Sequence, residues 1–177
     1  APEKASIRFH QYLKRLRQRV LGSSDYIVLQ DDYYRFDLDM LTWCDILAFE
    51  VLQNRIYQAE NNQVLPLQLE LIDLYHGPFL SGQEVGEWGD NYRSHYENQF
   101  LQIVKLAGEA LIEKQSFHEA IQVTNKGIVQ DYFREDLHQI ILRAYAHLGL
   151  YNELTAHYTQ LQQTFEQELN LPLDEAT

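Results

Sequence analysis

The sequence has few of the residues that cross-link or interrupt a chain. Its 177 residues include one cysteine, four prolines and eight glycines. The single cysteine, Cys44, excludes an internal disulfide and a cysteine-clustered zinc site, and it fits a reducing compartment, so we expect a cytoplasmic protein. Because glycine and proline are scarce, we expect long helices joined by short loops.

Long hydrophobic runs are also missing. Leaving glycine and proline aside, the longest apolar run has four residues, Ile46 to Phe49. A membrane-spanning helix needs about 20 apolar residues, so no contact with a membrane is expected. Hydrophobic residues nevertheless make up 45% of the chain, and 12 Tyr, 8 Phe and 2 Trp supply large side chains for a core. The composition therefore predicts a folded protein rather than a disordered one.

Positive charge is scarce and unevenly distributed. The chain has 14 Lys and Arg against 26 Asp and Glu, a net charge of -12. Residues 1 to 30 hold six of the basic residues and only Glu3 and Asp25 as acids, a net of 6 - 2 = +4, which leaves -16 for the remainder. An acidic surface repels nucleic acid, so contact with DNA is expected only at the N-terminal end.

Motifs for catalysis and for cofactor binding are absent from the sequence. Of the seven histidines, no two are three or four residues apart, and there is no His-Glu-x-x-His motif, so no metal site is expected. There is also no phosphate-binding loop, nucleophile elbow or dinucleotide-binding glycine motif. We therefore predict a protein that is not an enzyme and that needs no cofactor.

The first predicted helix covers residues 3 to 21 and has two distinct faces. Gly22 ends it, as a glycine that can adopt a left-handed conformation. The apolar face recurs at spacings of four, four, three and four, through Ala5, Phe9, Leu13, Leu16 and Val20. The polar face consists of Lys4, Arg8, Gln11, Arg15 and Arg19, with Lys14 and Arg17 beside them. Such cations and an amide suit DNA phosphates and base edges, although a merely solvated face has the same composition.

A β-hairpin is predicted directly after this helix, at about residues 26 to 37. Two β-branched and aromatic runs, 26–30 and 33–37, flank the turn-forming pair Asp31 and Asp32. A helix followed by a two-stranded wing is typical of the end of a winged helix-turn-helix, whose recognition helix enters the major groove. The chain enters the helical pattern immediately, so we also expect it to be part of a longer protein.

The remainder of the chain predicts helices only, near residues 41–59, 65–75, 92–115, 117–130, 134–148 and 151–168. The last third repeats: a displacement of 34 residues aligns Ile103 with Leu137 and Ala110 with Ala144. This period is typical of tetratricopeptide repeats. We expect both alanines to lie where helices cross, and we expect the aromatic residues ahead of the repeats to belong to the core. These are Trp88, Tyr92 and Tyr96.

Several short motifs combine into a recognisable pattern. They are Gly77-Pro78-Phe79-Leu80, Trp88, Arg93, Phe117-His118-Glu119-Ala120, Asp131-x-x-Arg134-Glu135 and Glu168-Leu169-x-Leu171-Pro172. Together they resemble the bacterial transcriptional activator domain of antibiotic-regulatory-protein-type transcriptional activators. In that family the domain follows a winged helix of the response-regulator kind. Upstream, Arg15-Leu16-Arg17, Tyr34-Arg35-Phe36 and Asp39 resemble its recognition helix, wing and junction.

We therefore predict a mainly α protein: residues 1–38 as the C-terminal part of a winged helix-turn-helix and residues 39–177 as a tetratricopeptide-like regulatory domain. The expected function is transcriptional regulation, with DNA bound in the full-length protein and with a second copy, the transcription machinery or another protein bound by the helical repeats. The residues expected to touch DNA are Arg8, Gln11, Lys14, Arg15 and Arg19. The alternative is a helical scaffold that binds a peptide or small ligand and makes no contact with DNA.

Overall fold

The computed structural model describes residues 2–40, 43–174 and 177. Within them the chain is mainly helical and carries one two-stranded hairpin, which confirms the expected fold class. It divides into two compact units, Ala1–Ala48 and Phe49–Thr177, which are described separately. A boundary between residues 38 and 39 stays a prediction.

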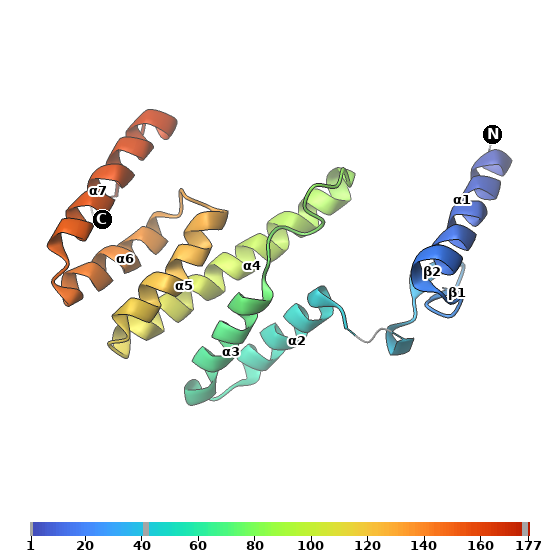
Figure 1. Cartoon of the computed structure of the whole chain (residues 1–177), viewed down its shortest axis with the longest axis horizontal. Coiled ribbons are helices and arrows are strands. Elements are labelled where there is room, and N and C mark those ends of the chain that lie inside the picture. The colour runs from blue at the N-terminus through green and yellow to red at the C-terminus, as the bar shows by residue number, and fades with distance from the viewer. Residues whose placement is uncertain (1, 41–42, 175–176) are drawn as a thin grey trace. The chain divides into compact units, whose positions relative to one another are not determined.

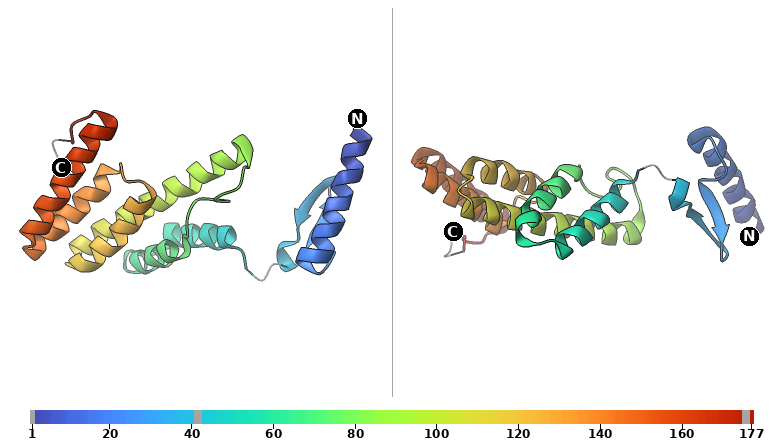
Figure 2. Two further views of the ribbon diagram at one scale, coloured as in Figure 1. Left: turned by 45° about the horizontal axis from the view of Figure 1, so that its top comes forward. Right: turned by 90° about the horizontal axis from the view of Figure 1, so that it is seen from below.

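The N-terminal unit begins with helix α1 (Pro2–Leu16), which continues into one π-helical turn (Arg17–Leu21). Gly22 ends this helix in the left-handed conformation, at a φ of 72°. Strands β1 (Ile27–Gln30) and β2 (Tyr33–Phe36) then form the hairpin (Figures 1 and 2). A short 3₁₀ turn, Leu38–Met40, follows it. Leu41, at the start of the predicted 41–59 helix, lies outside the described residues.

The hairpin is closed by a two-residue turn. Asp31 and Asp32 have φ angles of 52° and 64°, and two successive left-handed residues give the turn whose twist matches that of the strands. The strands are antiparallel, with Gln30 opposite Tyr33 and Ile27 opposite Phe36. The prediction of a hairpin at about residues 26 to 37 is therefore confirmed.

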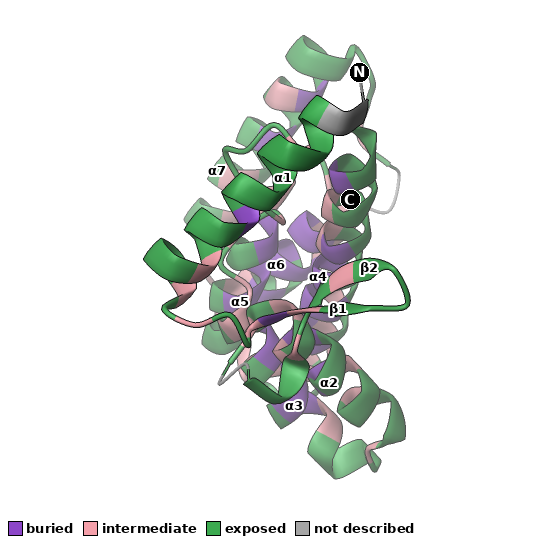
Figure 3. Ribbon diagram, turned by 90° about the vertical axis from the view of Figure 1, so that its right-hand side faces the viewer, coloured by how far each residue is buried: buried purple, intermediate pink, exposed green. Residues whose placement is uncertain are grey.

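The second unit is a helical array. Its helices are α2 (Asp45–Gln58, from Phe49 onwards), α3 (Asn61–Leu74), α4 (Gly86–Glu113), α5 (Phe117–Gln130), α6 (Glu135–Leu148) and α7 (Tyr151–Thr164), followed by a π-helical turn, Phe165–Leu169. Each helix from α3 to α7 packs on the next along the chain, and α4 also contacts α6 (Figure 1). Buried residues run through α3 to α6 (Figure 3).

The 34-residue period is visible in the backbone. In the turn between α4 and α5, the Ser116 N–H donates to the Leu111 carbonyl at 2.9 Å, and between α6 and α7 the Leu150 N–H donates to that of Tyr145 at 3.0 Å. Both partners are displaced by 34 residues. Gln115 and Gly149, also 34 apart, are both left-handed, with φ angles of 61° and 71°. The repeat is therefore one of conformation as well as of sequence.

Small residues lie where the helices of the array approach most closely, although not all at the predicted positions. Ala144 is fully buried, as expected, whereas Ala110 is only half-buried. The tightest approaches occur at two glycines. A Cβ atom on Gly108 would lie 2.7 Å from Thr124 Oγ1, and one on Gly127 would lie 2.7 Å from Leu137 Cδ1. The pairing of Ala110 with Ala144 thus missed the closest contact of the first repeat.

Two helices begin earlier than predicted. Helix α3 starts at Asn61, four residues before the predicted start, and Pro66 lies inside it. Helix α4 starts at Gly86 rather than near residue 92. Gly89 lies inside its first turn, where a Cβ atom would fall 1.9 Å from Val85 Cγ2. The glycines here permit a close helix start, and the sequence prediction had assigned them to a loop.

The expected burial of the aromatic cluster on α4 is correct only for Tyr96. Tyr96 is buried, but Trp88 and Tyr92 are 56% and 50% exposed. Because the first turns of α4 pack on Phe79 and the surrounding loop, these two rings contact other aromatic rings without being enclosed. The Phe79 and Tyr92 ring centres are 5.5 Å apart.

No helix within the described residues has both the length and the apolar character needed to cross a membrane.

Candidate functional site

The residues predicted to touch DNA form one continuous exposed face of α1 and the π-helical turn that follows. The five side chains are exposed, and none of them forms an ion pair within the described part of the chain. Arg15 also has its guanidinium 6.0 Å from the centre of the Tyr12 ring. The face therefore presents unneutralised cations to solvent. Its members are Arg8, Gln11, Lys14, Arg15 and Arg19, which we call the basic face.

Arg17, which the sequence places beside this face, points inward instead. Its Nη2 donates to the carbonyl of Ile27 on β1, and its Nε is buried without a partner in the described structure. The guanidinium therefore ties the end of the helix to the hairpin. Arg17 positions the two elements rather than extending the basic face.

A second tie joins the middle of α1 to the hairpin. The Tyr34 hydroxyl and His10 Nε2 are hydrogen-bonded at 3.2 Å, and the Tyr34 ring centre lies 5.2 Å from that of Phe9. On the hairpin itself, Arg35 is exposed and pairs with Asp31 at 3.3 Å. Helix and hairpin thus form one small body with the basic face directed outward.

A shallow hollow of about 480 Å³ lies at the C-terminal end of the basic face. An ammonium group, an amide and two hydroxyl groups around one hollow suit a phosphate oxygen. The sequence prediction named only Lys14 from this group, although the Gly-Ser-Ser run after the helix was the available signal. The hollow is lined by Lys14, Arg17, Gln18, Gly22, Ser23 and Ser24.

The apolar face of α1 is covered only in part. Leu13 is buried, but Phe9, Leu16 and Val20 are exposed, Val20 by 73%. The π-helical turn explains Val20, because its wider winding rotates later residues out of the 3.6-residue register on which the prediction relied. Packing of this face on the helical array or on a second copy stays a prediction.

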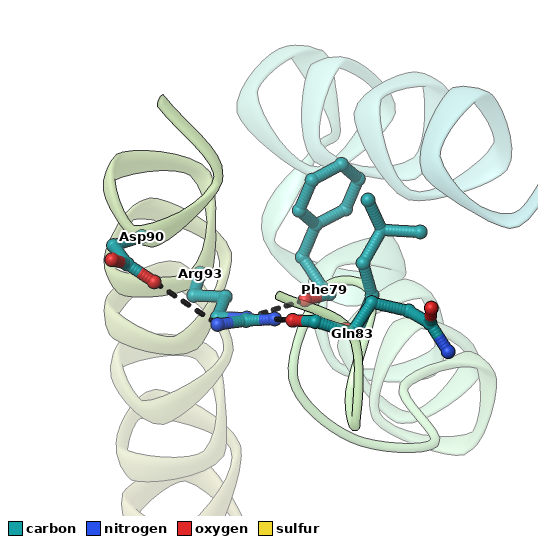
Figure 4. Close-up of polar contacts among 5 residues, drawn as sticks. Phe79, Gln83, Asp90 and Arg93 are labelled. Atoms are coloured by element: carbon teal, nitrogen blue, oxygen red, sulfur yellow. Dashed lines mark hydrogen bonds and ion pairs between the residues drawn. The ribbon is translucent and has the colours of Figure 1, made fainter. Parts of the chain in front are cut away.

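The motif Gly77-Pro78-Phe79-Leu80 is held by Arg93 on α4 (Figure 4). Arg93 Nε donates to the Phe79 carbonyl at 2.8 Å, and Nη2 donates to the carbonyls of Leu80 and Gln83 at 2.9 and 2.6 Å. Asp90 accepts from Nη1 at 3.0 Å. All three guanidinium nitrogens are engaged, so Arg93 acts as a clamp for this loop rather than as a ligand-binding group.

Two histidines join α6 to α7. His138 Nε2 lies 2.8 Å from the Tyr132 carbonyl, which can only accept, so His138 carries its proton there. Its bare Nδ1 then accepts from His157 Nε2 at 2.8 Å. Burial lowers the pKa of both groups, and burial together with the charge of His138 lowers that of His157 to about 4. This is a neutral structural pair.

Within the described residues, no three His, Cys, Asp or Glu side chains are placed to hold a metal ion together. The carboxylates and imidazoles found in pairs are occupied by hydrogen bonds between helices, as at His138. The geometry offers surfaces for binding, and it places no group of side chains in a catalytic arrangement within the described residues.

Comparison with protein families gives one match, the bacterial transcriptional activator domain, over residues 44–177. The match covers most of the chain, and the protein belongs to this family. The family consists of transcription-regulator domains, which are not enzymes. A comparison with curated proteins gave no match. The basic face and the hairpin precede the matched residues.

Proposed function

We propose that the protein is part of a transcription regulator that binds DNA through the basic face and binds another protein or a second copy through the helical array. Residues 1–38 are the end of a winged helix-turn-helix, with α1 as the recognition helix and β1–β2 as the wing. Residues 39–177 are the regulatory domain. The single cysteine fits action in the cytoplasm.

The observation that carries this proposal is the unpaired state of the basic face. Cations without acidic partners are free to replace the counterions of DNA phosphates. The ties from Arg17 and Tyr34 hold the hairpin against the helix, as a wing must be held beside a recognition helix. Family membership supports the regulatory part of the proposal, since the matched domain is a transcriptional activator domain.

The expected affinity of this chain alone is weak and independent of sequence. A recognition helix reads bases only when other elements fix its angle in the groove. The acidic remainder of the chain, at -16 by charge count, also repels phosphate at low salt. We therefore expect binding that is dominated by phosphate contacts and that falls steeply as salt is added.

Fluorescence anisotropy with a labelled duplex over a series of salt concentrations tests the proposal. Arg15→Ala and Arg19→Ala should each weaken binding and flatten the slope of log affinity against log salt by about 0.9. Lys114→Ala, an exposed cation of the array, is the matched control and should leave both quantities unchanged. If the two arginine variants bind like the control, the basic face is only solvated and the scaffold alternative holds.

A further inference from the structure

The helical array contains a groove of about 440 Å³ between α4, α6 and α7. Its floor is apolar, with Ile140, Leu142 and Leu154 among the lining residues, and its rim carries Lys105, Gln139 and Arg143. An apolar floor with a few polar groups at the rim is the usual composition of a peptide-binding or ligand-binding site.

The rim leaves positive charge available. Lys105 pairs with Asp136 at 3.4 Å, and Arg134 holds the same carboxylate through two hydrogen bonds, at 3.0 and 2.8 Å. Burial alone would raise the pKa of Asp136, but these two cations lower it overall, so the carboxylate stays charged and is neutralised locally. Arg143 is exposed and forms no ion pair with any described residue. Arg143 is therefore free to attract an acidic partner.

The segment after α7 already reaches this groove. Thr177 is one of its lining residues. The Thr177 hydroxyl donates to the Glu135 carboxylate and accepts from Gln139 Nε2 at 2.9 Å. The same Glu135 oxygen accepts the backbone N–H of Asp174 at 2.7 Å. Glu135 and Gln139 on α6 thus hold an extended strand of chain by its backbone and by one hydroxyl group, which is how a peptide ligand is held.

From these contacts we infer that the groove is a binding site for an extended acidic peptide with a hydroxyl residue, and that residues 170–177 occupy it as an internal ligand. The sequence of this segment, with Asp174 and Glu175, complements the free Arg143. A partner segment of the same chemistry has to displace it. The inference rests on the proposed function only for the role of the array in binding protein, and it is independent of DNA contact.

The test uses the full 177-residue chain and a fluorescein-labelled peptide with the sequence of residues 170–177, followed by anisotropy. Thr177→Val keeps the shape of the side chain and removes both hydroxyl hydrogen bonds of the internal ligand. The variant chain should therefore bind the added peptide about tenfold more tightly than the unaltered chain does. Thr177→Ser, which keeps the hydroxyl group, is the matched control and should bind the peptide like the unaltered chain.

Two further measurements identify the site. Gln139→Ala combined with Thr177→Val should remove the gain in affinity, and a peptide with valine in place of its last residue should bind about tenfold more weakly. Equal affinity of the unaltered and Thr177→Val chains, or no binding of the peptide to either, would overturn the inference. The salt dependence of DNA binding should be the same in Thr177→Val, so a failure here is distinguishable from a failure of the proposed function.

Discussion

The two units of the protein differ in how they use their apolar residues. Among the described residues of the N-terminal unit, only Leu13 and Ile27 are buried, and α1 is exposed along most of its length (Figure 3). The array encloses a continuous core in which Leu71, Val104 and Ile141 are fully buried. The stability of the chain therefore resides in the array, while the N-terminal unit keeps large apolar and cationic surfaces available for contact.

The charge of the two regions follows the same division. Residues 1 to 30 carry +4 by charge count and the remainder carries -16. An acidic, well-packed array stays soluble and does not compete for phosphate, and a small basic body can then supply the DNA contact. The comparison teaches that composition averaged over this chain hides two surfaces with opposite preferences.

Removing a buried side chain from each unit should break the symmetry most clearly. Ile141→Ala, in the array, should lower the free energy of unfolding by about 2–5 kcal/mol through the cavity it leaves. Leu13→Ala should leave the unfolding of the array unchanged, because it removes one of the few buried side chains of the other unit. Urea unfolding followed by far-ultraviolet circular dichroism measures both.

Val129→Ala is the control for the cavity experiment, since this side chain on α5 is exposed and its loss should change the free energy of unfolding by no more than about 0.5 kcal/mol. If Leu13→Ala and Ile141→Ala destabilise the same transition equally, the two units unfold as one and the comparison fails.

Overpacking the helix crossings should have the next largest effect. Ala144→Leu should cost about 1–3 kcal/mol in unfolding free energy, because Ala144 is fully buried on α6. Ala110→Leu should cost less, since this position on α4 is only half-buried. The same urea experiment ranks the two variants, and an equal or reversed ranking would contradict the helix contacts described here.

Acidification should weaken the array through the histidine pair. The pKa of His157 is lowered from 6.5 to about 4 by burial and by the charge of His138, so between these values the unfolded chain binds more protons than the folded one. Stability should therefore fall as the pH drops from about 6.5 to 4, and should be regained as it rises. Thermal unfolding at several pH values measures this slope.

His157→Gln should make that slope shallower, because it removes one of the two coupled groups. His118→Gln, at an exposed position on α5, is the control and should leave the slope as it is. A slope that is the same in both variants would place the pH dependence outside the pair.

The smallest stability change is expected on the basic face. Arg15→Ala replaces an exposed side chain that forms no ion pair in the described structure, so unfolding free energy should shift by no more than about 0.5 kcal/mol. Its effect should appear in DNA binding instead. A variant that loses stability and affinity together would show that Arg15 has a structural role, against the separation of roles between the two units.

Much of the fold was predictable from the sequence because local and tertiary signals agree. Helix α5 begins at residue 117 and ends at residue 130, as predicted, since its apolar periodicity is regular. The hairpin was also predictable, because Asp31 and Asp32 tolerate left-handed backbone between two β-forming runs. The basic face was located by its spacing alone, and its exposure agrees with that interpretation.

Other features depend on contacts that no local pattern encodes. The start of α4 was missed because its glycines signal a loop locally, while the structure uses Gly89 for close approach to Val85. The inward direction of Arg17 follows from a π-helical turn and from a carbonyl on β1, ten residues away. The peptide-like hold of Glu135 on Thr177 joins positions 42 residues apart. Such pairings require the folded array to be known.

The equivalence of the two turns at Gln115 and Gly149 makes one repeat a template for correcting the other. Both turns adopt the same left-handed conformation, yet one carries a side chain there and the other has none. A non-glycine residue in this conformation costs about 1 kcal/mol or more, so the first repeat holds strain that the second has already shed. Copying glycine from position 149 to position 115 would therefore strengthen the array without any new contact. The chain contains its own blueprint for that improvement, 34 residues further along.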